Sequence, residues 1–405
     1  MRPTFVIVGA SLAGASAAAT LRQEGVDGDV VLIGAESQYP YERPPLSKQY
    51  LRGEMPFEKA LVRPITFYEQ NHIEMRLGAR VTRVDPAAKA VHLESGSRIE
   101  YDKLLIATGV RNRRPHIPGL DLDGVFDLRS VTDADALRRQ LVSGRRAVVT
   151  GMGFIGCEVA ASLRHMGIEV VAIDRSPAPL FRVLGRQVGD TLAAIHRDHG
   201  VEMIAGDEVT RVEGDGRVER VVTKGGRRIA CDFVVAAVGV EPAVECLAGS
   251  GVALDDGIVV DEYCRSTVDG IYAAGDVANH FHPVFERRMR IEHWQNAMQQ
   301  GAAAARSMIG NGRPYDAIHW FWSDQYDVNL QYAGFHRNPT QTVVRGSVGL
   351  RSFLVFYLSG NRIDAVAGLN RGKDVRRAMP LIKARTPVDP RDLENEDLDL
   401  RSLVA

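Results

Sequence analysis

Two glycine-rich loops constrain the fold of this chain more than any other sequence feature. Residues 9–14 and 151–156 each follow a short β-branched apolar run, and each precedes a helix-like stretch and a second apolar run. Continuous apolar runs are typical of parallel strands buried on both faces, and strand, tight turn, helix, strand is the order of a βαβ unit. The repeated order predicts an α/β fold with two Rossmann-like dinucleotide-binding domains.

The second loop has the full G-x-G-x-x-G spacing of a dinucleotide-binding turn. Gly151 allows the tight turn, Gly153 lets the backbone approach a pyrophosphate, and Gly156 lets the helix pack close to the strand. Asp174 ends the next apolar run, where its carboxylate is expected to accept hydrogen bonds from the ribose hydroxyls of NADH. Arg175 follows directly and leaves the strictness of NADH over NADPH open.

The first loop differs at its centre, because Ser11 stands where the second loop has Gly153. Serine is small, so dinucleotide binding is still expected there. Glu36 is placed to contact the adenosine ribose, and Asp276, after Gly275 at the end of a later apolar run, is placed to bind the ribityl chain and phosphate of FAD. Two dinucleotide units favour a nicotinamide and a flavin, because a hydride passes directly between these two rings.

The order of these landmarks indicates that the second unit interrupts the first. We expect a discontinuous FAD-binding domain at residues 1–112 and 242–315, an NAD-binding domain at 113–241, and a C-terminal α+β domain at 316–405. Alternating apolar and polar residues in this last domain predict antiparallel strands, and one such strand is expected around residues 353–357.

Composition excludes several other classes of protein. The 45% apolar content includes no run long enough for a membrane helix, and the net charge of -1 gives no general nucleic-acid signature. The four cysteines form no C-x-x-C pair, which disfavours a zinc ribbon or a dithiol redox motif. We therefore expect a cytoplasmic protein with reduced thiols, no metal site, no membrane association and no nucleic-acid partner.

Five longer motifs carry a resemblance to a known family. They are residues 41–48 (YERPPLSK), 153–158 (GFIGCE), 271–277 (IYAAGDV), 290–297 (RIEHWQNA) and 321–326 (FWSDQY). With these motifs the chain resembles the FAD-dependent NADH:ferredoxin reductases, the putidaredoxin reductase-like branch of the glutathione reductase fold superfamily. The resemblance spans nearly the whole chain and implies FAD as cofactor and NADH as electron donor.

The resemblance also implies roles for individual residues. Lys48 matches a lysine beside flavin N5, where an ammonium group stabilises negative charge on the reduced ring, and Glu158 matches an acid near that lysine. These two are the candidate catalytic residues. The flavin-binding candidates, besides Lys48 and the residues already named, are Gly9, Ala13, Gly14, Arg43, Pro44, Val81, Ala107, Thr108, Gly109, Arg129, Glu292, His293, Trp294 and Trp322. The further NADH-binding candidates are Phe154, Ile155, Glu158, Arg182, Val238 and Gly239.

One absence in the sequence narrows the chemistry. Disulfide reductases of this fold use a cysteine pair soon after the first helix, and related peroxidases use a single cysteine there, whereas the first cysteine here is Cys157. Electrons are therefore expected to leave the flavin directly, in two single-electron transfers to a [2Fe–2S] ferredoxin that feeds a cytochrome P450 or Rieske oxygenase. Ferredoxins are usually acidic, so we expect transient electrostatic docking to which the basic run at residues 371–385 contributes.

Three alternatives to a ferredoxin reductase stay open. They are an NADH oxidase, a rubredoxin reductase, and a flavoprotein that signals in response to NADH, similar to apoptosis-inducing factor. The oligomeric state is likewise open between a monomer and a weak homodimer.

Overall fold

β-Branched residues form two parallel sheets, one in each of two units of the chain. The computed structural model describes residues 2–403. The first unit consists of the described residues up to Glu42, Glu58–Arg111 and Glu241–Trp320, and the second of Arg43–Phe57, Asn112–Val240 and the described residues from Phe321 on. The second unit thus joins the expected NAD-binding and C-terminal segments with residues 43–57. The three-domain boundaries divide the chain differently and stay a prediction.

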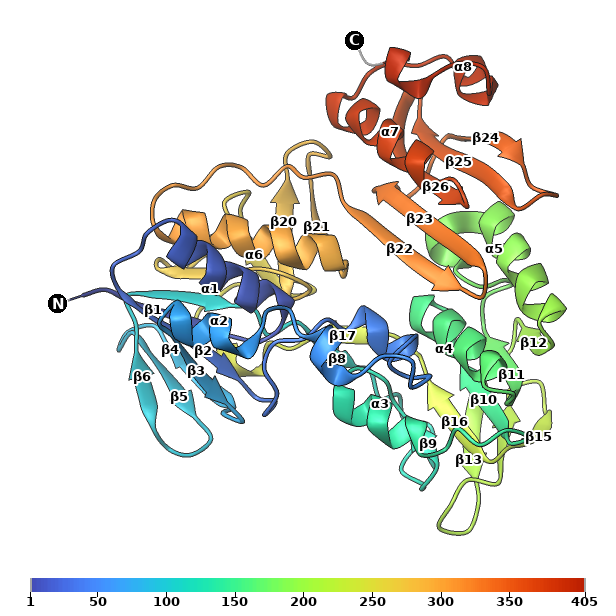
Figure 1. Ribbon diagram of the computed structural model, residues 1–405, viewed down its shortest axis with the longest axis horizontal. Coiled ribbons are helices and arrows are strands. Elements are labelled where there is room, and N and C mark those ends of the chain that lie inside the picture. The colour runs from blue at the N-terminus through green and yellow to red at the C-terminus, as the bar shows by residue number, and fades with distance from the viewer. Residues whose placement is uncertain (1, 404–405) are drawn as a thin grey trace. The chain divides into compact units, whose positions relative to one another are not determined.

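The first unit is built on a five-stranded parallel sheet in the order β19-β7-β1-β2-β3. Its strands are β1 (Thr4–Val8), β2 (Asp29–Gly34), β3 (Ile73–Leu77), β7 (Lys103–Ile106) and β19 (Ile271–Ala273). Alternate residues of a strand face opposite sides, so Ile7 joins one hydrophobic core while Val6 and Val8 join the other. Helices α1 (Leu12–Gln23) and α6 (Trp294–Met308) pack together over the first core (Figure 1).

The second core of this unit lies between the parallel sheet and smaller elements, and Val84 and Val91 of an antiparallel sheet join it. That sheet consists of β4 (Val81–Asp85), β5 (Ala90–Leu93) and β6 (Arg98–Glu100). A second three-stranded sheet consists of β18 (Ile258–Val260), β20 (Ala278–His282) and β21 (Arg287–Arg290). The short strands β8 (Val110–Asn112) and β17 (Val240–Pro242) form a two-stranded sheet. Short helices are η2 (Phe57–Ala60), α2 (Ile65–Gln70) and η3 (Glu245–Leu247).

The second unit repeats the parallel plan in the order β12-β11-β10-β16-β9. Its strands are β9 (Val125–Phe126), β10 (Arg146–Thr150), β11 (Glu169–Asp174), β12 (Val201–Ala205) and β16 (Phe233–Ala236). Its helices are η1 (Pro44–Ser47), α3 (Val131–Arg138), α4 (Phe154–His165) and α5 (Phe181–Asp198), and a small antiparallel sheet consists of β13 (Val209–Glu213), β14 (Arg220–Thr223) and β15 (Arg228–Ala230). The predicted repeat of a Rossmann-like unit is confirmed.

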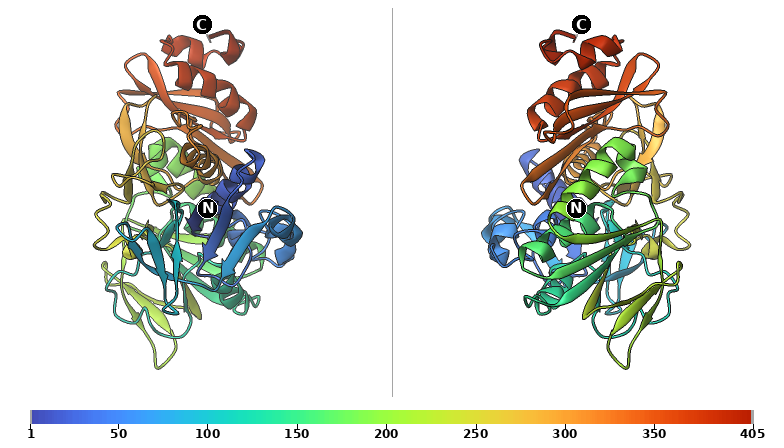
Figure 2. Two further views of the ribbon diagram at one scale, coloured as in Figure 1. Left: turned by 90° about the vertical axis from the view of Figure 1, so that its left-hand side faces the viewer. Right: turned by 90° about the vertical axis from the view of Figure 1, so that its right-hand side faces the viewer.

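The C-terminal segment forms a five-stranded sheet in the order β22-β23-β26-β25-β24. Its strands are β22 (Trp320–Gln325), β23 (Val328–Gly334), β24 (Gln341–Ser347), β25 (Ser352–Ser359) and β26 (Arg362–Leu369). The pairings of β25 with β24 and β26 are antiparallel, as the alternating sequence predicted. Helices α7 (Gly372–Ala384) and α8 (Pro390–Glu394) pack on this sheet, and η4 (Leu400–Leu403) follows them (Figures 1 and 2).

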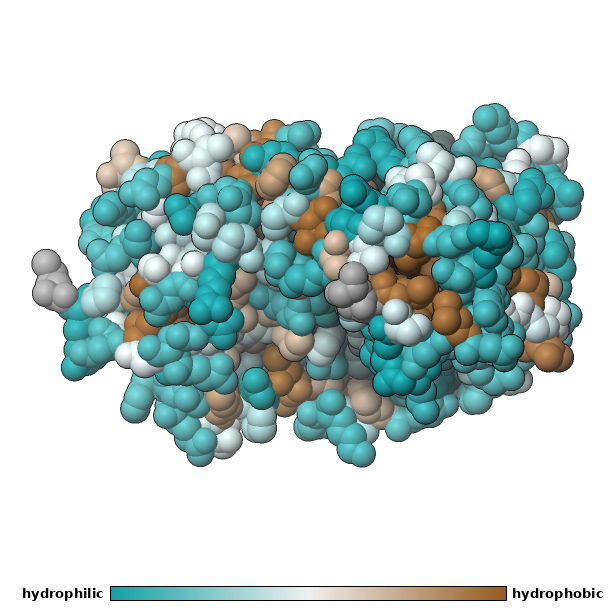
Figure 3. Space-filling view, turned by 90° about the horizontal axis from the view of Figure 1, so that it is seen from above, coloured by the Kyte–Doolittle hydropathy of each residue, from teal (hydrophilic) through white to brown (hydrophobic). Residues whose placement is uncertain are grey.

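The surface is mostly polar on the face drawn in Figure 3, where hydrophobic residues form only small groups. Within residues 2–403, none of the helices combines the length and the apolar character that crossing a bilayer requires.

Candidate active site

The first glycine loop is fixed by close backbone packing within its own unit. Gly9 has a φ of 119°, and a Cβ atom there would lie 2.1 Å from the Ala107 carbonyl oxygen. A Cβ atom at Gly14 would lie 2.0 Å from the Gly9 carbonyl oxygen, because α1 begins directly against the end of β1. Only glycine satisfies both positions, and Ser11 is the N-cap of the helix that follows. The free N–H groups of this helix end suit a phosphate.

The second loop repeats these contacts and leaves its middle position open. Gly151 has a φ of 91°, and a Cβ atom there would lie 2.3 Å from the Ala237 carbonyl oxygen. A Cβ atom at Gly156 would lie 1.9 Å from the Gly151 carbonyl oxygen. At Gly153, by contrast, no atom of the described chain lies within 4 Å of the Cβ position. The open space at the start of α4 is where a bound pyrophosphate would approach.

The end of β19 lies beside the first loop. Gly275 has a φ of 80°, and its Cβ position is 3.0 Å from the Cβ atom of Ala13. The Gly275 amide donates to the Gln300 side chain at 2.9 Å, which fixes the turn against α6. The structure therefore brings Gly275, the residue before Asp276, to the start of α1. The contact of Asp276 with the ribityl chain and phosphate of FAD stays a prediction.

The two acids that follow the loops both have protein partners. Asp174 accepts hydrogen bonds from the Met152 amide at 2.5 Å and the Ser176 amide at 2.6 Å. Tyr41 donates its hydroxyl to Glu36. A carboxylate has about four lone-pair positions, so each acid still has acceptor capacity for a ribose hydroxyl. Their ribose contacts stay a prediction.

Lys48 and Glu158 form a buried ion pair in the second unit. Both residues are 5% exposed, and Lys48 Nζ lies 2.7 Å from Glu158 Oε2. Ser47 donates its hydroxyl to the same oxygen at 2.5 Å, and Ser323 donates to Glu158 Oε1 at 2.7 Å. A second donation from Lys48, to the Pro44 carbonyl at 3.1 Å, fixes the direction of the ammonium group. Each carboxylate oxygen therefore has a donor, as a buried charge requires.

Three separate segments supply this pair and its partners. Pro44 opens η1, where its fixed φ suits the first helical position, and Lys48 is the C-cap residue of the same short helix. Glu158 lies on α4 just after the glycine loop, and Ser323 lies on β22. Trp322 precedes Ser323 on this strand and is half-buried on its other face.

Other flavin candidates lie in both units. In the second unit, Arg43 donates to the Arg129 carbonyl at 2.5 Å, so these two candidates lie together. In the first unit, burial lowers the pKa of His293, the N-cap of α6, to about 3. The remaining candidates of this unit are Val81 at the start of β4, Thr108, whose hydroxyl donates to the Ala243 carbonyl, Gly109, Glu292, which pairs with Arg290, and the partly buried Trp294. Their contacts with a flavin stay a prediction.

The NADH candidates line one edge of the second parallel sheet. Phe154 packs edge-on against Phe321 with ring centroids 4.5 Å apart, and Ile155 is 43% exposed at the first turn of α4. Val238 is half-buried after β16 and Gly239 has a φ of 103°. Arg175 and Arg182 are both exposed.

The four cysteines are free and buried. Burial raises the pKa of Cys231 to about 12 and that of Cys246 to about 11, and it raises the pKa of Cys157 well above its usual value. A thiol with such a pKa provides almost no thiolate near pH 7. Thiol redox chemistry is therefore disfavoured at these positions.

Three buried histidines lie together in the first unit, although the sequence predicted no metal site. One nitrogen each of His280, His282 and His319 lies within 4.8 Å of the others. Burial lowers the pKa of His280 to about 3 and that of His319 well below its usual value, so both imidazoles are neutral near pH 7. Two backbone groups already bond both nitrogens of His282, and the charge of Arg288 acts against a further cation. The absence of a metal stays a prediction.

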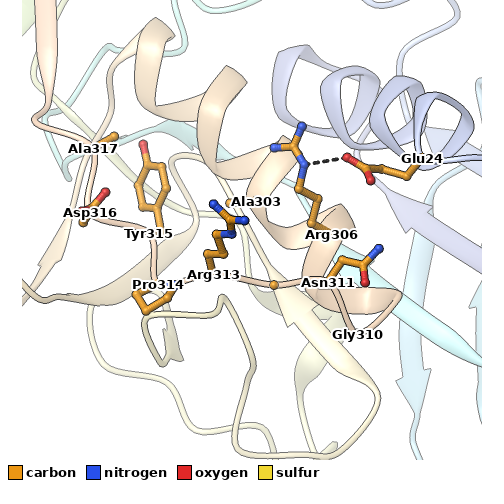
Figure 4. A pocket seen from close by; sticks show the side chains of 11 residues that line it. Glu24, Ala303, Arg306, Gly310, Asn311, Arg313, Pro314, Tyr315, Asp316 and Ala317 are labelled. Atoms are coloured by element: carbon orange, nitrogen blue, oxygen red, sulfur yellow. Dashed lines mark hydrogen bonds and ion pairs between the residues drawn. The ribbon is translucent and has the colours of Figure 1, made fainter.

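A pocket that the sequence did not predict opens beside the C-terminal ends of α1 and α6 (Figure 4). Its volume is about 690 Å³, and Arg306 pairs with Glu24 across its wall at 2.8 Å. It is lined by Glu24, Ala303, Arg306 and residues 310–317, none of which is among the dinucleotide candidates.

The basic run at residues 371–385 is partly neutralised by acids. Arg371 and Arg377 form ion pairs with Asp374, and Arg385 forms one with Asp364. Arg371 also pairs with Glu396 at 2.8 Å. Lys373 and Arg376 are exposed on the same helix, so they are the part of the run best placed for docking.

Sequence reasoning missed Ser47 and Ser323 as partners of Glu158. Both serines lie within the motifs at residues 41–48 and 321–326, so those motifs held the signal. The serines are 111 and 165 residues away from Glu158 along the chain, and no local pattern predicts such a contact.

Comparison with known families gives two matches that together span nearly the whole chain. Residues 3–301 match the pyridine nucleotide-disulphide oxidoreductase family, and residues 320–404 match the reductase C-terminal family.

Individual proteins are similar over their full length. The anthranilate 1,2-dioxygenase system ferredoxin–NAD(+) reductase component of Burkholderia cepacia is 40% identical over 99% of both chains. Among solved structures, putidaredoxin reductase in its covalent complex with putidaredoxin has a TM-score of 0.96 at 33% identity and covers 99% of this chain and 98% of that chain. The ferredoxin reductase for the CYP199A2 system of Rhodopseudomonas palustris has a TM-score of 0.96 at 35% identity and covers 100% of both.

Proposed function

The chain belongs to the pyridine nucleotide-disulphide oxidoreductase family, and we propose that it is an NADH-dependent ferredoxin reductase of an oxygenase system. It is an oxidoreductase whose relatives include ferredoxin–NAD(+) reductase components. The observation that carries the proposal is similarity to such components over the full length of both chains, including the C-terminal domain. The lack of a cysteine before Cys157 agrees with it, because electrons then leave without a thiol intermediate.

FAD and NADH are the two cofactors we propose for the two loops. The residues fit these groups, because each loop ends in a helix N-terminus with a glycine that only close backbone packing explains. Bound FAD would accept a hydride from NADH and release electrons one at a time. Gly9, Gly14, Gly275 and Asp276 would hold FAD, and Gly151, Gly153, Gly156 and Asp174 would hold NADH.

Lys48 is the residue we propose to act on the reacting ring. Its ammonium group is buried, directed by the Pro44 carbonyl and paired with Glu158, so it presents a positive charge in a fixed direction. A preorganised cation stabilises negative charge that develops during reaction without reorganising solvent. Glu158 keeps this cation in place and compensates its charge within the protein.

Docking of a [2Fe–2S] ferredoxin is proposed to be transient and electrostatic, with Lys373 and Arg376 of α7 contributing. We further propose a monomer or weak homodimer, acting in the cytoplasm, where buried thiols such as Cys157 stay reduced. The oxygenase that receives the electrons is proposed to be a cytochrome P450 or a Rieske enzyme.

The test is a reductase assay with the flavin-loaded protein. We expect NADH to drive cytochrome c reduction that depends on added [2Fe–2S] ferredoxin, with NADPH at least about tenfold less effective because Asp174 favours a free ribose hydroxyl. Rapid oxygen consumption without ferredoxin would instead identify an NADH oxidase. Transfer only to rubredoxin would identify the rubredoxin variant.

A further inference from the structure

A continuous chain of buried hydrogen bonds leads from Glu158 to helix α5. Ser323 donates to Glu158 Oε1 at 2.7 Å, and Gln325 Nε2 donates to Ser323 Oγ at 3.2 Å. Gln325 Oε1 lies 3.1 Å from His196 Nε2, and His196 Nδ1 lies 3.0 Å from the Tyr326 hydroxyl. Ser323, Gln325 and His196 are each no more than 1% exposed. All of these residues belong to the second unit.

The Glu158 carboxylate at one end fixes the direction of every donor along this series of hydrogen bonds. A carboxylate only accepts, so Ser323 gives its single proton to Glu158 and must accept from the Gln325 amide. The Gln325 carbonyl then faces His196, which has to donate from Nε2. A neutral imidazole with a proton on Nε2 accepts at Nδ1, where Tyr326 donates.

His196 is held in this neutral form by its surroundings. Burial lowers the pKa of His196 to about 4, partly offset by the hydrogen bond to Gln325, so the imidazole carries one proton over the physiological range. His199 stacks on the ring of Tyr326 with ring centroids 3.7 Å apart and makes none of the hydrogen bonds described above. The four donors therefore all point toward Glu158, an arrangement in which each bond polarises the next.

We infer that His196 and Gln325 are positioning residues for the Lys48–Glu158 pair, acting through the Ser323 hydroxyl. This inference rests on the proposed role of Lys48 beside the flavin. Gln325 orients the serine proton, and His196 fixes which end of the Gln325 amide faces the serine. Without them Ser323 can rotate its proton away, and the buried carboxylate loses a donor that stabilises its charged form.

The titratable groups that act along this chain come from several elements. Lys48 follows η1 and pairs with Glu158. Cys157 precedes Glu158 on α4, and its raised pKa keeps it neutral. At the far end, the charge of Arg164 acts on Tyr326, and His199 stacks on the same ring.

The experiment measures flavin reduction by NADH in a stopped-flow instrument between pH 5 and 9, using flavin-loaded His196→Leu and Gln325→Leu. We expect the limiting rate of flavin reduction to fall roughly threefold to tenfold in both variants, because the donor to Ser323, or the group that orients this donor, is lost. The apparent KM for NADH should stay within about twofold, because neither side chain lies in the second glycine loop.

Two matched variants make the result specific. His196→Gln retains a donor and an acceptor at nearly the same reach and should restore the wild-type profile. His199→Leu removes the stacked ring from the same helix region without removing a donor of the chain, so its profile should match wild type. If either Leu variant fails to retain flavin, the other variant and Tyr326→Phe, which removes only the outermost donor, give the same comparison.

The outcome separates this inference from the proposed function. If Lys48→Met slows flavin reduction but the profiles of Gln325→Leu and His196→Leu superimpose on wild type, the positioning role is wrong and the role of Lys48 stands. If Lys48→Met leaves the rate unchanged, the proposed site itself is wrong. The same slowing in His196→Gln as in His196→Leu, or a rise in the apparent KM for NADH as large as the loss of rate, would also overturn the inference, because either result indicates a general structural defect and not the loss of a donor.

Discussion

The two glycine loops share two constraints and differ in a third. In both, the protein itself excludes a side chain at the last glycine, because a Cβ atom at Gly14 or Gly156 would lie 2.0 or 1.9 Å from a carbonyl oxygen of the same loop. The middle position is different: the first loop has Ser11, and the second has Gly153 with open space around it. The outer glycines are therefore required by backbone packing within the protein, whereas the residue type at the middle position is limited by the space that the ligand needs.

The acids after the loops differ as well. Asp174 is tied to the backbone of its own loop through the Met152 amide, whereas Glu36 bonds the Tyr41 hydroxyl. The second loop is thus hydrogen-bonded directly to its acid. The first loop is instead supported by the end of β19, where Gly275 packs against Ala13. The difference suits a tightly retained cofactor at the first loop and an exchanging one at the second.

The largest expected effect is the loss of one ligand when a side chain is introduced at the last glycine of either loop. Gly14→Val should abolish flavin retention, whereas Gly156→Val should keep the flavin and lower the NADH-dependent rate more than about 100-fold, because each side chain would strike backbone. Flavin absorbance per chain and NADH turnover measure the two effects. Gly349→Val is the control, since its Cβ position has open space within the described chain and its φ is not positive. Loss of flavin in both loop variants would break the assignment of one ligand to each loop.

A second effect comes from a buried histidine of the first unit. Burial lowers the pKa of His280 in the first unit to about 3, while an unfolded chain binds that proton near pH 6.5. The unfolded state therefore takes up more protons below about pH 6.5, and stability falls as the pH falls from there toward 3.

Denaturant unfolding at pH 7, 6 and 5 tests this expectation. His280→Phe should lessen the loss in the free energy of unfolding, with a difference in slope that approaches about 1.4 kcal/mol per pH unit between pH 6 and 5. The exposed His116→Phe should have the wild-type slope. An unchanged slope in His280→Phe would show that this imidazole does not stay neutral in the folded protein.

A smaller effect is expected from exchanging the middle residues. Gly153→Ser should raise the KM for NADH roughly threefold without loss of flavin, because the open space accepts a hydroxymethyl group but the pyrophosphate then lies farther from the backbone. Ser11→Gly should change the affinity for the flavin by less than this factor of about three. Steady-state kinetics over a range of NADH concentrations distinguish the KM effect from a change in kcat. A larger effect at Ser11 than at Gly153 would reverse the comparison.

The smallest effect concerns docking. Arg376→Glu should lower ferredoxin reduction about twofold to fivefold at low salt and leave NADH-to-ferricyanide activity unchanged. Arg377→Glu is the informative companion, because Arg377 already pairs with Asp374 at 3.0 Å and its charge is partly neutralised. Equal losses with ferricyanide and ferredoxin in Arg376→Glu would exclude α7 as a docking element.

The sequence predicted those features that depend on neighbours along the chain. The glycine loops, the parallel strands beside them and the antiparallel strand near residue 355 follow from local patterns. Contacts between distant segments were not predictable: Ser47 and Ser323 meet at Glu158, and the acid that neutralises Arg385 is Asp364. The net charge of a run of basic residues in the sequence overstates its charge in the folded protein for the same reason, because folding brings acids from other segments close to it.

The measurement that tests the central proposal most directly is an anaerobic single-turnover experiment. The purified protein is reduced with one equivalent of NADH and mixed with oxidised [2Fe–2S] ferredoxin, then separately with oxygen. A ferredoxin reductase should contain one FAD per chain, be reduced quickly by NADH, and pass two electrons to two ferredoxin molecules faster than it reacts with air-saturated buffer. A protein that retains no FAD, or one whose reduced form reacts with oxygen faster than with any ferredoxin, would contradict the proposal.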